Sequence, residues 1–500
     1  MTQPLLPPGL LLALLTAWLP ATLAFPLSAS AQSPSSSTSA GVPAQVVLRP
    51  QLVRPLPGGL DQVLVVNDNN PELIRSPGIL LSSFEPKAVI AGQPLAVPSA
   101  HLDVPLQGRF EIFSHHVYAG RPESADSTLW LAVVAAPRGN RSVRLRLVAG
   151  ATALSQSNDP SQPAAPFLPL PPLLNQNGEG PYAGPGSRVA GELLTRQPRN
   201  PLLPEQWTLI PGQLTTLLAL PLPVRGLDPL LNGRNLQLRL ESDGPLSVAT
   251  LASLGGDKPP AEAEWTRLLQ GDLSPKEHPP SPLGSLGPVI YSRVSGLQQG
   301  SLWRASLTDP GKTTLSVRSA PVSWPISSLD RGRLGSGQVQ TAPLKRRYPD
   351  TAWAAHGNYG IEYDLTLPLL NDTNAPVSLQ LALDSPLKGD APIGGLRFNA
   401  TPPRAVTFRG LIEVRGLDGP SGRPSGPQGF HLVLRQGQSG PALGTVSLAP
   451  RGQRRLRVRL IYPADATPPQ ALSLLPLDAP PAAGGPQPAV KQSGVSPGTP

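Results

Sequence analysis

The sequence contains no cysteine, and this absence excludes several kinds of chemistry at once. Disulfide bonds, lipid-bearing cysteine anchors, thiolate metal sites and cysteine nucleophiles all require that residue. Aromatic residues are also scarce, at 4% of the chain, and charged residues make up only 15%. A chain of 500 residues can nevertheless bury enough apolar surface to fold without covalent cross-links.

Short motifs of common catalytic sites are also missing. The sequence has no H-E-x-x-H zinc motif, no phosphate-binding P-loop and no C-x-x-C pair. Only six histidines occur, and the adjacent pair His115–His116 would point to opposite faces of a strand, so the two cannot chelate one metal together. We therefore assign no catalytic residue, no metal ligand and no cofactor.

No apolar run reaches the roughly 20 residues that a membrane-spanning helix needs. The run from Gly9 to Ala24 is shorter, and the A-x-A pattern at residues 29–31 follows it. This order is typical of a secretory signal peptide cleaved after Ala31, with Ala24 as a second cleavage point. An uncleaved membrane anchor is the alternative. The pattern predicts export to the periplasm, the cell envelope or the extracellular space, with no transmembrane segment after cleavage.

Proline and glycine are abundant, with 67 and 49 residues, and they separate short apolar segments instead of forming one tract. Within these segments apolar and polar residues alternate, as in "YGIEYDLTLPLL" and "RRLRVRLIY". Such a period of two indicates half-buried antiparallel strands. The sequence therefore predicts an all-β fold of two β-sandwich-like, immunoglobulin-like units.

The same composition suggests a division of the chain. The predicted segments are a signal peptide (1–31), a Ser-rich linker (32–43), an N-terminal β-sandwich (44–255), a helix with a Pro-rich linker (256–285), a C-terminal β-sandwich (286–478) and a disordered Pro/Gly/Ala tail (479–500).

Two short helices interrupt this β pattern. "PAEAEWTRLLQG" (260–271) has acidic residues in its first turn and an apolar set at Trp265, Leu268 and Leu269. "SRVAGELLTR" (187–196) could begin at Ser187 as an N-cap, although Gly191 weakens it as a helix former.

The two halves of the chain share an order of segments that resembles an internal duplication. "LWLAVVA", "VRLRLV" and "WTLIPGQLTTLLALPLPV" in the first half correspond to "YGIEYDLTLPL", "VSLQLAL" and "VSLAPRGQRRLRVRLIYP" in the second. Ahead of them, "GRFEIF" corresponds to "GQVQTA". Two related sandwich units would explain this order, although any two sandwiches share some strand–turn–strand rhythm. The match would place residues 114–120 and 345–357 in equivalent connections.

Most of the unusual chemistry lies in one stretch, "KRRYPDTAWAAHGNYG" (345–360). Loops at the end of a sandwich often carry function on a rigid scaffold. We predict a ligand-binding loop in which cations contact an anion and aromatic rings stack on a ligand. Its candidate residues are Arg346, Arg347, Tyr348, Asp350, Trp353, His356 and Tyr359.

The formal net charge of +9 favours an anionic partner. Nucleic acid is a poor candidate for an exported protein, so we expect an anionic cell-envelope glycan or an envelope protein. The alternative function is a carbohydrate-active hydrolase that uses two carboxylates, for which Glu111, Asp350 and Glu362 are the candidates.

Several long motifs resemble a known family. "LPGGLDQVLVVNDNNPELIRSPGILLSSF", "GRFEIFSHH", "NGRNLQLRLESDGPL" and "GSGQVQTAPLKRRYPDTAWAAHGNYG" are similar to segments of a cyanobacterial family of exported proteins, catalogued only as a domain of unknown function. The similarity runs from about residue 45 to 475. It implies a cyanobacterial origin and export, and it supplies no activity, ligand or catalytic residue.

Overall fold

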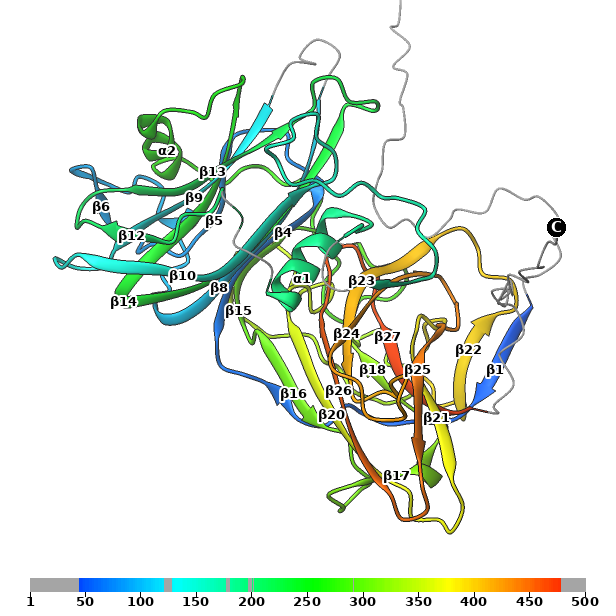
Figure 1. Cartoon of the computed structure of the whole chain (residues 1–500). Helices are drawn as coiled ribbons and strands as arrows, with labels where there is room; N and C mark the ends of the chain where they lie inside the picture. Colours follow the sequence, from blue (N-terminus) through cyan, green and yellow to red (C-terminus); the bar gives the residue numbers. More distant parts are fainter. Residues whose placement is uncertain are drawn as a thin grey trace, which may run out of the picture. The chain divides into compact units, whose positions relative to one another are not determined.

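The computed structural model describes residues 45–120, 128–176, 180–196, 200, 202–290 and 292–477. The predicted signal peptide (1–31), Ser-rich linker (32–43) and C-terminal tail (479–500) lie outside these residues. The described chain is built mainly of strands, with two α-helices (Figure 1). The predicted all-β fold with two sandwiches and two short helices is confirmed.

The first sandwich is formed by a single sheet that folds back on itself. One layer contains, in hydrogen-bonded order, β12 (Gln206–Leu209), β10 (Val143–Leu154), the first half of β14 (Leu231–Gly255), β8 (Leu106–Ala119), β4 (Leu64–Leu73), β15 (Val294–Gln299) and β19 (Leu344–Arg347). The facing layer contains β13 (Thr215–Pro223), β9 (Thr128–Pro137), the second half of β14 and β5 (Gly78–Ser82).

The second sandwich consists of two separate sheets around one core. The larger sheet contains β11 (Leu173–Gln176), β24 (Gln428–Arg435), β23 (Val406–Arg415), β26 (Gln453–Ile461), β20 (Glu362–Leu370), β16 (Leu302–Ser306) and β3 (Gly59–Leu60), with β17 (Leu315–Ser316) also beside β20. The smaller sheet contains β2 (Leu52–Val53), β18 (Val322–Ile326), β27 (Gln470–Pro476), β21 (Val377–Asp384) and β25 (Ala442–Leu448).

Two ribbons lie outside these sheets. They pair β1 (Val46–Pro50) with β22 (Gly395–Asn399), and β6 (Val89–Ile90) with β7 (Gln93–Pro94).

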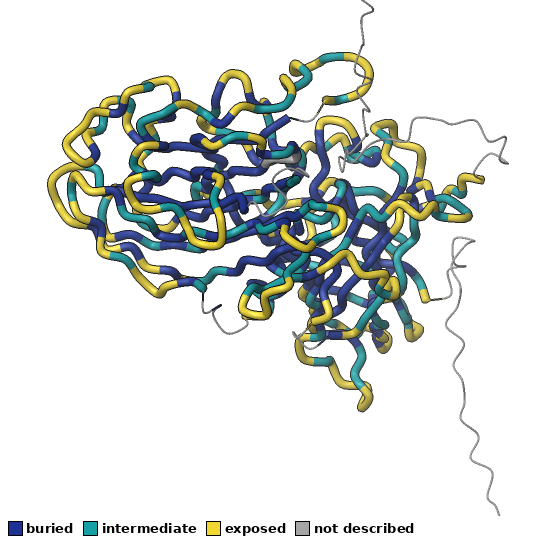
Figure 2. Tube along the Cα trace, turned by 90° about the horizontal axis from the view of Figure 1, so that it is seen from above, coloured by how far each residue is buried: buried dark blue, intermediate teal, exposed yellow. Residues whose placement is uncertain are grey.

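Alternation along the strands builds both cores. On β20, Tyr363, Leu365 and Leu367 are buried in the core of the second sandwich. On β26, every second residue is buried in the same core. Figure 2 shows mainly buried residues inside the molecule and exposed residues in the outer connections. The predicted inward faces are thus confirmed. The outward residues Glu362 and Asp364 are buried as well, which the alternation did not predict.

Each sandwich contains a series of five hydrogen-bonded strands, and the strands of the two series follow the same relative order along the chain. The first contains β12-β10-β14-β8-β4 and the second contains β25-β21-β27-β18-β2. In each series the first three pairings are antiparallel and the last is parallel. The facing layers also correspond, because β13 pairs with β9 as β26 pairs with β20. This agreement in order and direction supports the predicted duplication.

One part of the predicted alignment is wrong. The counterpart of β8, which contains "GRFEIF", is β18 and not "GQVQTA", since β8 and β18 hold the same place in the two series. Residues 345–357 therefore belong to the connection from β18 to β20. Its equivalent in the first sandwich is the connection from β8 to β9, whereas His115 and His116 lie within β8 itself.

Strands are exchanged across the boundaries expected from composition. β15 and β19, which follow residue 286, extend the sheet of the first sandwich. In the other direction, β2, β3 and β11 join sheets of the second sandwich although they precede residue 255. The ranges 44–255 and 286–478 stay a prediction, and neither holds all the strands of one sandwich.

Helix α2 (Glu262–Leu269) lies where the sequence predicts it, and Trp265, Leu268 and Leu269 are buried against the first sandwich. Helix α1 (Pro185–Thr195) begins three residues earlier than an N-cap at Ser187 predicts, because Gly184 is the N-cap, Pro185 is the first helical residue and Ser187 lies inside the helix. The Ser187 hydroxyl donates to the carbonyls of Ala183 and Gly184.

Helix α1 contacts strands of both sandwiches, namely β10, β14, β23 and β26 (Figure 1). Val189, Leu193 and Leu194 of the helix pack in one cluster with residues from β10, β23 and β26. The β10 contribution is Ala149, Ala151 and Ala153, whose small side chains let the helix approach the strand closely. The helix therefore fills the space between the two outer faces.

Candidate functional site

The first half of the crowded loop is fixed to the first sandwich. Arg346 is exposed on β19, whereas one nitrogen of the Arg347 guanidinium donates to the carbonyls of Tyr348, Pro349 and Thr351 at 2.9–3.2 Å. Arg347 therefore closes a turn of its own loop. The Tyr348 hydroxyl donates to the Ala100 carbonyl at 2.8 Å inside the core, and burial raises the pKa of that hydroxyl.

The second half of the loop divides into anchoring and accessible residues. Asp350 is paired with Lys276 at the surface. The Tyr359 hydroxyl donates to the Ala466 carbonyl at 3.0 Å. Trp353 is 36% exposed and lines a cavity together with His356, whose pKa is lowered to about 4 by burial. Of the seven predicted residues, Arg346, Asp350 and Trp353 are thus exposed, and Asp350 is engaged by Lys276.

The carboxylates considered for a hydrolase are already engaged. Glu111 of β8 and Glu362 of β20 lie on either side of Arg239, at 3.3 and 3.0 Å from its nitrogens. Burial raises the pKa of Glu111, and Gln237 donates to its second oxygen at 3.1 Å. Glu362 also accepts from Arg459 at 2.7 Å. These carboxylates act together as an ion-pair cluster that joins the two sandwiches.

A second candidate site lies on the outer face of the larger sheet of the second sandwich. Cross-strand register sets side chains there in rows. One row alternates in charge: Arg304, Asp364, Arg459 and Glu413. The next row does not alternate: Ser306, Thr366, Arg457 and Arg415. We call the outward arginines of this sheet, Arg304, Arg415, Arg455, Arg457 and Arg459, the arginine face.

The acidic residues of this face are all paired. Two nitrogens of Arg457 donate to the two oxygens of Asp364 at 2.7 and 2.8 Å, and this contact holds the pKa of Asp364 below its ordinary value. Arg459 bridges Glu362 and Glu413, at 2.7 and 3.2 Å. The charge left over on the face is therefore positive.

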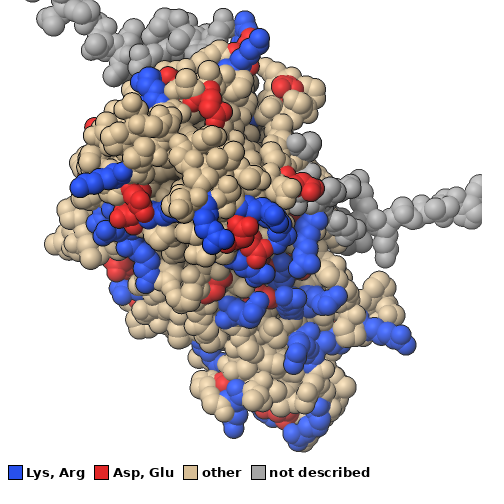
Figure 3. Space-filling view, turned by 90° about the vertical axis from the view of Figure 1, so that its left-hand side faces the viewer, with Lys and Arg blue, Asp and Glu red and all other residues tan. Residues whose placement is uncertain are grey.

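Two of its arginines have no partner within the described chain. Arg415 and Arg455 are exposed, and neither side chain forms an ion pair or hydrogen bond with another described residue. Basic side chains outnumber acidic ones in the lower half of Figure 3, which views the side where β16 and β20 lie. This surface can accept an anion without breaking an existing contact.

From the sequence, the arginines of "RRLRVRLIY" are explained first as the solvent side of a strand and only second as a binding patch. The signal that identifies the face is cross-strand register, because Arg415 lies directly opposite Arg457 and is far from it in sequence. Register between distant strands is not visible in the alternation of a single strand.

A buried polar pair was also missed. The stretch "VVNDNNPELI" is rich in Asn, Asp and Pro, which favour turns, but it forms most of β4. The Asp68 carboxylate accepts a hydrogen bond from Nε2 of His116 at 2.8 Å, and both side chains are fully buried. Asn67 donates to Gln298 of β15 at 2.7 Å. These long-range partners stabilise an extended conformation where local residue preferences favour a turn.

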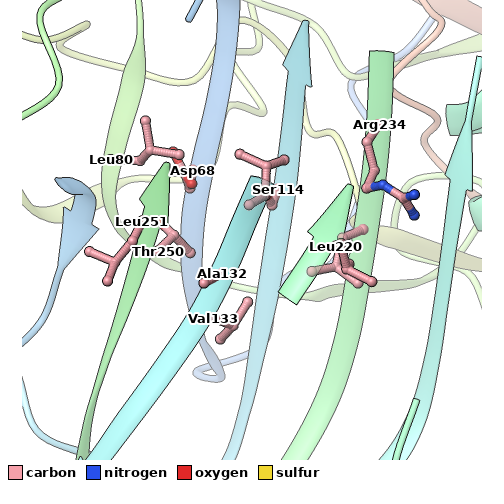
Figure 4. Close-up of a pocket in the computed structure, with 11 residues that line it drawn as sticks. Asp68, Leu80, Ser114, Ala132, Val133, Leu220, Arg234, Thr250 and Leu251 are labelled. Atoms are coloured by element: carbon pink, nitrogen blue, oxygen red, sulfur yellow. The ribbon is translucent and has the colours of Figure 1, made fainter. Parts of the chain in front are cut away.

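A small cavity lies near Asp68 inside the first sandwich (Figure 4). Its volume is about 10 Å³, and its polar residues Asp68, Ser114, Arg234 and Thr250 stand among leucine, alanine and valine side chains. That volume is comparable to the space needed by one water molecule. The cavity is therefore too small for an organic ligand.

Within the described ranges, no group of three histidine or acidic residues is arranged to hold a metal ion. No helix in this part of the chain is both long and apolar enough to cross a membrane.

Comparison with known proteins places the chain in a family without supplying an activity. The family model described as "Protein of unknown function (DUF3370)" matches residues 51–476. A search of curated proteins returns no match. Among solved structures, the chain is similar to the crystal structure of Lac15 from a marine microbial metagenome, with 11% identity and a TM-score of 0.11. The alignment covers 85% of this chain and 65% of that one, so the chain spans less than two thirds of its length.

Proposed function

Because the chain belongs to the DUF3370 family, whose description names no activity, we propose a function from its surface: an exported, non-enzymatic binding module for an anionic cell-envelope glycan. The ligand lies on the arginine face. Export is the expectation given by residues 1–31 and by the resemblance to exported cyanobacterial proteins.

The observation that carries this proposal is the pairing of Arg415 with Arg457. These residues are direct cross-strand neighbours in an antiparallel pair. Like charges in that position destabilise a sheet. Asp364 compensates the charge of Arg457, whereas the charge of Arg415 has no partner among the described residues. The free guanidinium of Arg415 can bind a carboxylate, sulfate or phosphate through two parallel hydrogen bonds.

One further feature favours a glycan over other anions. The same row continues from Arg457 to the hydroxyls of Thr366 and Ser306, which can exchange hydrogen bonds with sugar hydroxyls.

The acidic residues Glu362, Asp364 and Glu413 are held by arginines. Carboxylates in such contacts are poorly placed to serve as a proton donor and a nucleophile, which supports binding over hydrolysis.

The test compares two double variants with the same change in charge. Arg415→Gln/Arg455→Gln removes the two unpartnered arginines of the face. Lys312→Gln/Arg404→Gln removes two exposed cations elsewhere. We expect the wild-type protein to bind immobilised polygalacturonate at low salt, and the first variant to bind about tenfold more weakly. The difference should vanish near 1 M salt, where charges are screened beyond about 3 Å.

Equal binding by the two double variants would exclude the arginine face. Absence of wild-type binding to polygalacturonate and to dextran sulfate, with neutral dextran as the reference, would exclude an anionic glycan altogether.

A further inference from the structure

A cavity larger than the one near Asp68 lies beside the crowded loop and shares no lining residue with the arginine face. Its walls come from three parts of the chain: residues 352–356 with Trp353 and His356, residues 329–331 with Thr341, and residues 280–290. The cavity volume is about 70 Å³. Since one water molecule needs about 10–15 Å³ of such volume, this cavity has room for several water molecules.

The wall that carries Trp353 is rigidly anchored. Tyr348 and Tyr359 fix the two ends of the loop by hydrogen bonds to the Ala100 and Ala466 carbonyls. Between them, the Ala352 amide donates to the Arg293 carbonyl at 2.9 Å, and Ala352 and Ala355 pack on β15. The indole ring is therefore presented by a fixed backbone while 36% of the residue stays exposed. Pre-organisation of this kind reduces the entropy lost on binding.

The opposite wall, residues 280–290, is a closed loop. The amide and hydroxyl of Ser281 bond to the carbonyl and amide of Ile290, at 3.2 and 2.8 Å. The Arg331 guanidinium donates to the carbonyls of Ser285 and Gly287. Arg331 thus fixes this loop over the cavity.

Polar groups of the cavity combine donors and acceptors with no net charge. The indole N–H of Trp353, the carboxylate of Asp330 and the hydroxyl of Thr341 form no hydrogen bond with any described residue. Asp330 and Arg331 contribute opposite charges to the same rim. His356 is neutral because burial lowers its pKa to about 4.

We propose that this cavity binds one uncharged sugar ring of a saccharide, stacked on the face of Trp353. The ring supplies both an apolar face for the indole and hydroxyls for the polar groups. Asp330 accepts a hydrogen bond from a sugar hydroxyl, and the Trp353 indole donates one. A cationic ligand fits less well, since Arg331 offsets the charge of Asp330. The site shares no residue with the arginine face and does not depend on it.

Calorimetric titration with chitotriose, cellotriose and maltotriose tests this assignment, with tryptophan fluorescence as a second measurement. We expect at least one trisaccharide to bind with a dissociation constant at or below about 1 mM. Trp353→Ala should weaken that binding at least about tenfold, and Trp353→Phe should weaken it less because a ring remains. Asp330→Asn should weaken it without affecting folding, since Asp330 is exposed.

Phe167→Ala is the matched control, because Phe167 is an exposed aromatic residue outside the cavity. It should bind the trisaccharide as the wild type does, and so should Lys312→Gln/Arg404→Gln. Failure of all three trisaccharides to bind overturns the proposal. So does equal affinity of Trp353→Ala and wild type when circular dichroism shows that both are folded.

Discussion

Asp68 and His116 are fully buried between the layers of the first sandwich, with 2.8 Å between their polar atoms. A buried pair of this kind contributes little net stability compared with an apolar pair, but the removal of one partner leaves a polar group without compensation. The other Asp68 oxygen and the Nδ1 of His116 already have no hydrogen-bond partner within the described chain. The loss of a further hydrogen-bond partner at this site would consequently destabilise the folded state.

We expect Asp68→Ala to lower the free energy of unfolding by about 3–5 kcal/mol. Urea denaturation followed by circular dichroism measures the change. Arg146→Ala is the control, because the Arg146–Glu241 pair has both side chains largely exposed, and such pairs contribute about 0–1 kcal/mol. A similar loss in the two variants would contradict this account of Asp68.

His431 gives the stability a predictable dependence on pH. Burial, together with the nearby charge of Arg409, lowers its pKa from 6.5 to about 4. The unfolded state therefore takes up a proton before the folded state as the pH falls. The contribution of neutral His431 to the free energy of unfolding is fully present above pH 6.5 and is lost progressively as the pH falls from 6.5 to 4.

His431→Gln should therefore lose less free energy of unfolding than the wild type between about pH 7 and pH 4.5. Urea titrations at both values measure this difference. His278→Gln changes an exposed histidine and should keep the wild-type dependence. Asp465, whose pKa is raised to about 7 by burial, contributes in the opposite direction, and the comparison of variants cancels it. Identical pH dependence of His431→Gln and wild type would refute the assignment.

At the scale of elements, α1 depends on a glycine that intrinsic helix preference disfavours. A Cβ at Gly191 would lie 2.4 Å from Cε1 of Tyr182, which is far inside contact distance. Tyr182 is itself buried. Close approach of the helix to this ring explains a glycine at a position where alanine would favour the helix by about 1 kcal/mol.

Gly191→Ala should destabilise the protein by about 1–3 kcal/mol, since overpacking exceeds the gain in helix preference. Thermal denaturation tests the sign of the change. In a Tyr182→Leu background, where the ring is absent, the same substitution should become neutral or stabilising. Stabilisation by Gly191→Ala alone would show that the ring moves aside without cost.

Elements defined by local pattern could be predicted from the sequence. Alternation gave the inward faces of β20 and β26, and α2 followed from its apolar set and acidic first turn. The burial of Glu362 and Asp364 could not be predicted, because their partners Arg239 and Arg457 come from distant strands. The candidate loop could be recognised because its unusual residues are contiguous in the sequence. The cavity wall at residues 280–290 and the arginine face could not, because both depend on contacts between segments that are distant in sequence.

At the scale of the whole molecule, the exchange of strands joins the two sandwiches more closely than their sequence order suggests. β15 covers the edge of β4, and Arg239 of β14 bridges to Glu362 of β20. An isolated first half would lack both contacts and would expose β4 as an unpaired edge.

We therefore expect residues 44–255 alone to aggregate or to lack cooperative unfolding. Expression of this segment beside residues 44–477 measures the effect by size-exclusion chromatography and thermal denaturation. The longer segment, which keeps every described strand, is the control. A soluble, cooperatively unfolding 44–255 segment would show that β15 and β19 are dispensable to the first sandwich.

β14 runs through both layers of the first sandwich, pairing with β8 and β10 along one half and with β9 along the other. Neither layer can come apart while this strand stays intact, so local breathing of one layer must propagate to the other. Amide hydrogens along the whole of β14 should consequently exchange with solvent at a common slow rate, as parts of one opening event.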